Sequence, residues 1–145
     1  MAAEPCGRVE QLILEVSLED ARAYIEQLNL GYIVETMCSA SYPLPKWTLS
    51  DAEHCCRLYK NFILLQRIYK TEPLVPTREI DEFWHNHILH TKAYITDCMH
   101  IFGYYLHHEP ASPRDNPTDL IHQYQKTKDY YFQEFKQPMQ LIKFV

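Results

Sequence analysis

Histidine is concentrated in one part of this sequence. Six of the eight histidines lie within the 24 residues from 85 to 108, where even placement would put only one or two. They are His85, His87, His90, His100, His107 and His108. Neutral imidazole is a common metal ligand and loses no proton when it binds an ion near pH 7. The stretch between Trp84 and Pro110 therefore predicts a site for a divalent metal, with zinc, iron or copper as candidates.

The spacing of these histidines limits which of them could share one ion. His87 and His90 are three residues apart, so on a helix they share a face and could hold a metal from adjacent turns. His85 and His87 are two residues apart, and a regular helix points them about 200° from one another. His85 therefore needs a distorted helix to join them, or it has another role. Asp81, four residues earlier, could orient it by accepting its ring N–H, as carboxylates behind metal ligands do.

Further ligands could come from beyond the next helix. If that helix folds back on the preceding one, His108 would approach the first group, with His107 beside it. Tyr94 and Cys98 could line the same cleft, because positions 87, 90, 94, 97 and 98 follow helical spacing. The predicted metal ligands are His85, His87, His90 and His108, the predicted supporting residues are Asp81, Trp84, Asp97 and Glu109, and the candidates to act near a substrate are Tyr94 and Cys98.

Each of these histidines also has a structural interpretation. Single histidines are most often exposed or hydrogen-bonded in a core, and that group is expected to contain His54, His100 and His122. Asp81 and His85 could form an ordinary ion pair along a helix, and Trp84 could be a core residue. The sequence contains no HExxH motif, so no specific signature identifies a metal. The density of histidines from 85 to 90 is the observation that favours a metal site.

Prolines divide the chain into helical blocks, and the pattern predicts an all-α fold. We expect residues 1–145 to form a single compact bundle of about five to seven helices with irregular proline-containing loops, and the histidine-rich motif to occupy residues 74–110. Three glycines are too few for the turns of a typical β-sandwich. Expected helix caps are Ser17, Thr48 or Ser50, Thr77, Thr91 and Asn116. Residues 141–145 are apolar enough to dock as a short strand or helix.

Composition and charge argue against several classes of partner. The net charge is −5 and the basic residues are scattered, so a nucleic-acid partner is not expected. No apolar run approaches the length of a membrane span. The five cysteines are odd in number and contain no CxxC pair, which predicts free thiols in a reducing, cytoplasmic compartment. The first residues lack a basic segment followed by an apolar one, so no signal for general secretion is expected, although a specialised export system could still carry the chain.

Across residues 59–110, a series of short motifs occurs in an order and spacing typical of a known family. The motifs are Leu74-Val75-Pro76-Thr77, Ile80-Asp81, Trp84-His85-Asn86-His87, Tyr94, Asp97-Cys98 and His108-Glu109-Pro110. Together they resemble the core of the glycine-rich domain-containing protein-like family, whose biochemical role is uncharacterised. The resemblance implies a helical fold and picks out His85, His87, His108, Asp81 and Asp97. Thr91 stands where a proline often follows, Glu109 replaces an aspartate, and the glycine-rich region of plant members is missing.

Three functions are consistent with these observations, and whether the protein is an enzyme is left open. The first is a metal-binding protein, which could be a metal-dependent enzyme if the ion keeps an open position for substrate. The second is a non-catalytic helical module that binds a partner or host protein, because eleven tyrosines are many for this length. The third is a small-molecule pocket without metal that uses Trp84 and His85. An exposed aromatic patch without a concave polar pocket would favour the second.

Overall fold

The computed structural model describes residues 14–140, and within them the chain forms six α-helices and no strand. The helices are α1 (Leu18–Gln27), α2 (Gly31–Cys38), α3 (Leu49–Ile68), α4 (Arg78–Leu89), α5 (Thr91–Ile101) and α6 (Pro117–Phe135). The all-α prediction is confirmed, with a number of helices inside the expected range. None of the described helices combines the length and the apolar character needed to cross a membrane. The element expected at 141–145 lies outside the described residues.

Side-chain caps fix where most of these helices begin. Three of the predicted caps each accept a hydrogen bond from the backbone N–H three residues later, and they are Ser17, Thr48 and Thr77. Asn116 caps α6 in the same way, and Pro117 supplies its first residue, where a missing N–H costs nothing. Helix α5 is different because it begins at Thr91 itself. It follows a one-residue turn at His90 that has no side-chain cap, so the expected cap at Thr91 is not used.

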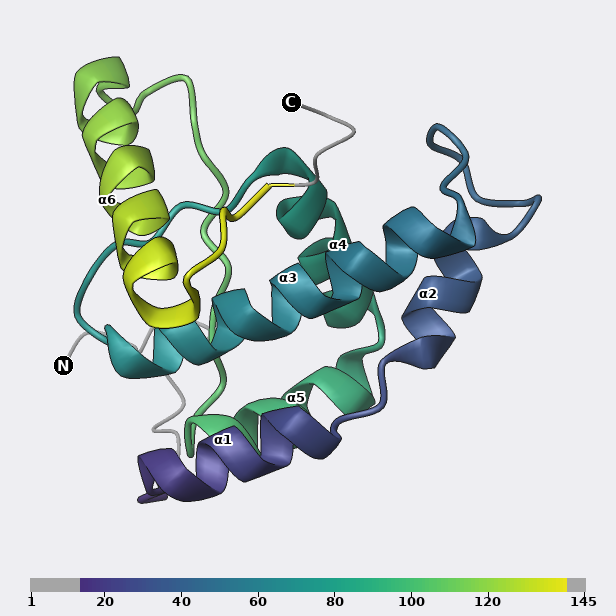
Figure 1. The fold of residues 1–145 in the computed structure, drawn as a ribbon, viewed down its shortest axis with the longest axis horizontal. Helices are drawn as coiled ribbons and strands as arrows, with labels where there is room; N and C mark the ends of the chain where they lie inside the picture. Colours follow the sequence, from purple (N-terminus) through teal and green to yellow (C-terminus); the bar gives the residue numbers. More distant parts are fainter. Residues whose placement is uncertain (1–13, 141–145) are drawn as a thin grey trace, which may run out of the picture.

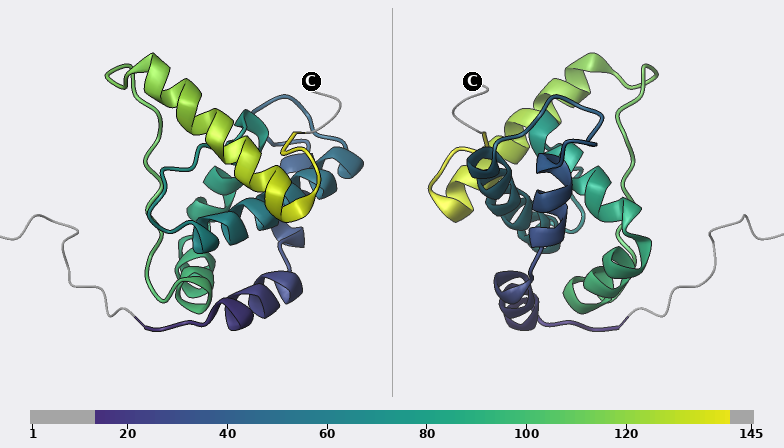
Figure 2. Two further views of the ribbon diagram at one scale, coloured as in Figure 1. Left: turned by 60° about the vertical axis from the view of Figure 1, so that its left-hand side comes forward. Right: turned by 90° about the vertical axis from the view of Figure 1, so that its right-hand side faces the viewer.

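Helix α3 lies at the centre of the arrangement. It packs against α1, α2, α4 and α6, while α5 lies against α1 and α4 (Figure 1). Figure 2 shows α6 on the side of α3 opposite the pair formed by α1 and α5. The apolar face of α3 is buried at Leu58, Phe62 and Leu65, and it meets the buried Ile80 and Phe83 of α4. Burial of each such side chain stabilises the fold by about 1.5–3 kcal/mol.

The connection from α5 to α6 begins with a glycine turn. Gly103 has a φ of 79°, in the left-handed region that glycine adopts without steric cost. The backbone N–H of Leu14 donates to the Gly103 carbonyl at 2.9 Å, and a Cβ on Gly103 would lie 1.8 Å from the Leu14 carbonyl oxygen. Residues 104–116 then continue without helix or strand and place His108 against α4. This backbone turn therefore determines how the segment that carries His108 leaves α5.

A carboxylate on α4 holds the loop between α2 and α3. Oε2 of Glu82 accepts hydrogen bonds from the Tyr42 hydroxyl and from the ring N–H of Trp47, both at 2.7 Å. The amide of Asn86, one turn later, donates to the Tyr42 hydroxyl and to the Glu82 carbonyl, both at 3.0 Å. One face of α4 is thus occupied by loop contacts, and the site described below uses another.

Candidate metal centre

Asp81, His85 and His108 bring three potential metal-binding atoms together on one side of α4. Asp81 and His85 are one turn apart on the helix, and His108 comes from the connection between α5 and α6. The two imidazole Nε2 atoms are 2.9 Å apart. Asp81 places Oδ1 at 2.7 Å from His108 Nε2 and Oδ2 at 3.3 Å from His85 Nε2. Among the described residues, no other three His, Cys, Asp or Glu side chains form such a group.

The hydrogen-bonding capacity of these groups does not match the number of their contacts. A ring Nε2 carries either one proton or one lone pair. Each of the two Nε2 atoms nevertheless faces two partners, the other imidazole and one carboxylate oxygen. With a proton on each nitrogen, both rings can donate to Asp81, but the two N–H groups are then crowded because their nitrogens are 2.9 Å apart. A single proton leaves one nitrogen lone pair facing an acceptor. A cation between the three atoms would satisfy all of them, because each could direct a lone pair at it.

The distances between the three atoms are close to those between ligands of one ion. Ligands at about 2.0–2.1 Å from zinc are roughly 3.3 Å apart in tetrahedral geometry and roughly 2.9 Å apart at right angles. The observed separations run from 2.7 to 3.3 Å when the distances to Asp81 are taken to Oδ1 for His108 and to Oδ2 for His85. Small movements of the side chains are therefore enough to admit a first-row divalent ion. Both geometries fit, so the spacing does not select among zinc, iron and copper.

The candidate centre opens onto a cleft. The exposed fraction of the side chain is 51% for His85, 33% for Asp81 and 10% for His108. A cavity of about 640 Å³ lies beside them, between the start of α4 and the start of α6. Asp81, Trp84 and His108 form part of its wall, and Glu109 also lines it. A small molecule bound in this cleft would lie next to the three ligand atoms.

His87 and Asp97 belong to a different, buried network. His87 is 2% exposed, and its Nδ1 is 2.6 Å from the Tyr59 hydroxyl. Its Nε2 lies 2.8 Å from Asp97 Oδ2, and the other Asp97 oxygen accepts a hydrogen bond from Tyr24 at 2.6 Å. Both ring nitrogens of His87 are therefore occupied by groups from α3 and α5. The structure does not bring His87 or Asp97 into the group around Asp81.

The remaining histidines also lie outside that group. His90 leaves the helix at the C-cap of α4, where its Nδ1 is 2.8 Å from the Asn86 carbonyl, and its ring meets the edge of Tyr32. His100 stacks on Tyr24 with ring centroids 4.6 Å apart. The others are exposed, and they are His54, His107 and His122. Of the four predicted ligands, the structure therefore brings together His85 and His108.

Tyr94 and Cys98, the candidates to act near a substrate, are interior residues. Tyr94 is 1% exposed and Cys98 is 2% exposed. Burial raises the pKa of the Cys98 thiol to about 11, so the thiolate is scarce near neutral pH. Burial also raises the pKa of Tyr94, whose hydroxyl is hydrogen-bonded within the protein. Neither group can reach a ligand in the cleft without rearrangement of the core.

Asp81 has a larger place in the site than the sequence indicates. It was expected to support His85 from behind, but its two carboxylate oxygens face both imidazoles. The sequence signal for the pair with His85 is their four-residue separation on a helix. No comparable sequence spacing predicts the contact between Asp81 and His108, because that contact depends on the path of residues 104–108.

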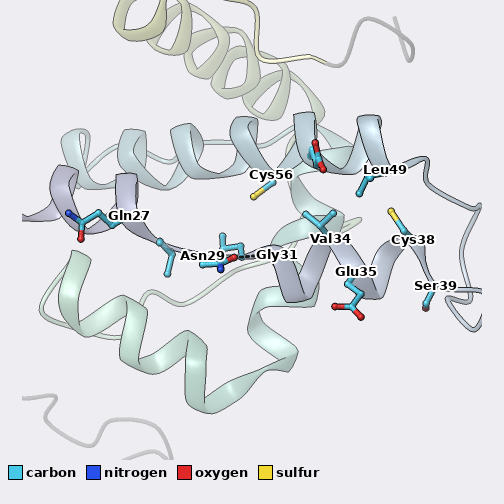
Figure 3. A pocket seen from close by; sticks show the side chains of 12 residues that line it. Gln27, Asn29, Gly31, Val34, Glu35, Cys38, Ser39, Leu49 and Cys56 are labelled. Carbon is cyan, nitrogen blue, oxygen red and sulfur yellow. Dashed lines mark hydrogen bonds between the residues drawn. The ribbon is translucent and has the colours of Figure 1, made fainter.

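A second cavity, of about 850 Å³, is lined mainly by apolar groups between α2 and α3. Figure 3 shows Val34 and Cys38 of α2 facing it across from Leu49 and Cys56 of α3. Burial raises the pKa of both thiols, which makes them weak nucleophiles near neutral pH. This cavity contains no histidine and lies apart from the candidate metal centre.

The tyrosines do not form an exposed binding surface. All eleven lie in described segments, and each is buried or half-buried. Among the large apolar side chains that are exposed in residues 14–140, Phe132 is the only aromatic one. The tyrosines, whose number favoured an interaction module, are therefore directed inward. The concave polar cleft beside Asp81 and His108, which favours a ligand site, is present.

These features define a helical protein with a candidate metal centre on its surface. The chain belongs to the UCP032817-like family, whose family model matches residues 20–129 and so includes all three members of the centre. That family is uncharacterised, and it is not the glycine-rich domain-containing family that the motifs resemble. The prediction that the chain belongs to an uncharacterised family is confirmed, but the particular family named from the motifs is not. No curated protein and no solved structure matches the chain.

Proposed function

We propose that this protein binds one divalent first-row metal ion, with zinc as the first candidate, through Asp81, His85 and His108. The observation that carries the proposal is the convergence of one carboxylate and two Nε2 atoms, with separations of 2.7 to 3.3 Å. The stacking of His108 on Trp84, with ring centroids 4.0 Å apart, supports it because the ring is held in place before any ion arrives.

The composition of the site favours a reactive ion over a purely structural one. Structural zinc sites are usually closed by four protein ligands, whereas three protein ligands leave a position for water or substrate. Here the open side is the cleft, where a ligand can lie beside Asp81 and His108. A bound zinc ion supplies Lewis acidity and lowers the pKa of a coordinated water. We infer that the protein acts on, or senses, a small molecule held in this cleft.

Metal binding to the purified full chain tests the proposal. Protein stripped with a chelator is titrated with Zn²⁺ and, separately, with Co²⁺, and the stoichiometry is measured by elemental analysis. We expect one ion per chain, with an affinity that falls on acidification because protons compete for the same lone pairs. His85→Ala and His108→Ala should each lower the affinity by more than the roughly 10- to 100-fold that loss of a supporting group causes.

Two control variants separate this site from the other histidines. His54→Ala removes an exposed imidazole on α3 and should leave binding unchanged. His90→Ala tests the predicted partner of His87, and it should also leave binding unchanged because that ring lies outside the group. Wild-type protein without a stoichiometric ion, or equal binding in the His85→Ala and His108→Ala variants, would refute the proposal.

A further inference from the structure

The backbone that leads to His108 is hydrogen-bonded to a hydroxyl group in the core. His108 lies in residues 104–116, which form no helix or strand, so regular backbone hydrogen bonding does not fix it. The carbonyl of Leu106, two residues earlier, accepts a hydrogen bond of 2.6 Å from the hydroxyl of Tyr94 on α5. This contact ties the backbone next to His108 to a side chain that is 1% exposed.

The same hydroxyl also holds the ring on which His108 rests. The indole N–H of Trp84 donates to the Tyr94 hydroxyl at 3.0 Å. The Trp84 ring lies nearly parallel to that of His108, at an interplanar angle of 16°. Tyr94 therefore acts on His108 from two directions, through the backbone at Leu106 and through the stacked indole.

We propose that Tyr94 and Trp84 are positioning residues of the metal centre, which place His108 Nε2 against His85 and Asp81. This inference rests on the proposed function for its effect on metal affinity, but the placement of His108 is a property of the protein by itself. The hydroxyl of Tyr94 uses one donor and one acceptor in these two contacts. Its role is therefore to hold the ligand in position, at a distance from any group bound in the cleft.

Tyr94→Phe is the variant that tests this proposal, because it keeps the buried ring and removes only the hydroxyl. We expect the dissociation constant for Zn²⁺ to rise by about 10- to 100-fold, the range typical for loss of a group that orients a ligand. The absorption bands of bound Co²⁺ should also change, since they report the geometry of the ligands.

A matched control is Tyr131→Phe. Tyr131 is also fully buried, and its hydroxyl accepts a hydrogen bond from Asn61 at 3.0 Å, on the interface between α3 and α6. Tyr131→Phe should lower stability, as Tyr94→Phe does, but leave both the zinc affinity and the cobalt spectrum as in the wild type. Equal loss of metal affinity in both variants would mean that stability, and not position, was responsible.

A second measurement works without any metal. The proximity of the Trp84 ring should shift the ring protons of His108 upfield in the NMR spectrum of the metal-free protein. This shift should shrink in Tyr94→Phe and persist in Tyr131→Phe. An unchanged His108 shift in Tyr94→Phe would overturn the positioning role.

The outcomes also separate the two proposals. If Tyr94→Phe binds zinc like the wild type while His108→Ala does not bind it, the positioning role fails and the metal centre stands. If the wild type binds no metal but the His108 shift depends on Tyr94, the metal centre fails and the positioning of His108 is supported.

Discussion

Replacement of Gly103 by alanine should destabilise the protein through a single backbone turn. At a φ of 79°, an alanine costs about 1–2 kcal/mol more than glycine. Its Cβ would also meet the Leu14 carbonyl oxygen at 1.8 Å, so the hydrogen bond from Leu14 to Gly103 must break, at a cost of about 0.5–1.5 kcal/mol. We therefore expect a loss of roughly 1.5–3.5 kcal/mol in the free energy of unfolding, or a fall of roughly 5–10 °C in Tm.

Gly31→Ala is the matched control for this change. Gly31 is the first residue of α2, and the nearest atom to an added Cβ is Asn29 Oδ1 at 3.0 Å, at the end of a side chain that can move. Alanine there should leave stability within about 1 kcal/mol of the wild type, because it also restricts the unfolded chain. Urea unfolding followed by circular dichroism measures both variants. Equal stability of Gly103→Ala and Gly31→Ala would refute the argument from backbone conformation.

Two further predictions concern groups whose pKa values are raised by burial. In native protein at neutral pH, iodoacetamide should modify the half-buried Cys38 and Cys56 before the buried Cys55 and Cys98. Peptide mass spectrometry follows the labelling of each cysteine. Labelling of Cys98 before Cys38 and Cys56 would contradict its burial and its pKa of about 11. Stability should fall above about pH 10. Burial and the hydrogen bond to Glu82 raise the pKa of Tyr42 to about 12, and burial raises the pKa of Tyr59 well above its ordinary value. The folded protein keeps protons that the unfolded chain releases, so this stabilisation is complete below about pH 10. Tyr42 alone should remove at most about 1.4 kcal/mol per pH unit between about pH 10 and pH 12. Urea unfolding at a series of pH values measures this loss, and a free energy of unfolding that stays constant between about pH 10 and pH 12 would contradict the assignment.

The helices could be predicted from the sequence because their signals are local. Ser17 and Thr77 each place a hydroxyl just before a first helical turn that contains acidic residues. The hydroxyl accepts a hydrogen bond from a backbone N–H of that turn, whichever element the helix packs against. The apolar stripe of α3 likewise indicates its buried face without knowledge of the partner helices. What such signals cannot give is the arrangement of the helices, since α3 packs against elements on both sides of it in sequence.

The candidate site was only partly predictable, for the same reason. The pairing of Asp81 with His85 follows from helical spacing alone. The spacing of His87 and His90 indicates a shared face only if both residues are helical, but His90 lies at the C-cap with a ψ of 70°, outside helical geometry. His87 points toward α3 and α5, where Tyr59 and Asp97 occupy its ring nitrogens. His108 reaches the site through contacts that depend on the path of an irregular segment.

Helix α4 carries three polar networks on three of its faces: one at the candidate centre, one through Glu82 to the neighbouring loop, and one through His87 into the core. Insertion of one residue in the helix would turn everything after it by about 100° and misalign these networks together. Evolution of this protein can therefore change α4 by substitution far more easily than by a change of length. Substitutions should be tolerated best at the C-terminal end of α4, where Leu89 is 76% exposed.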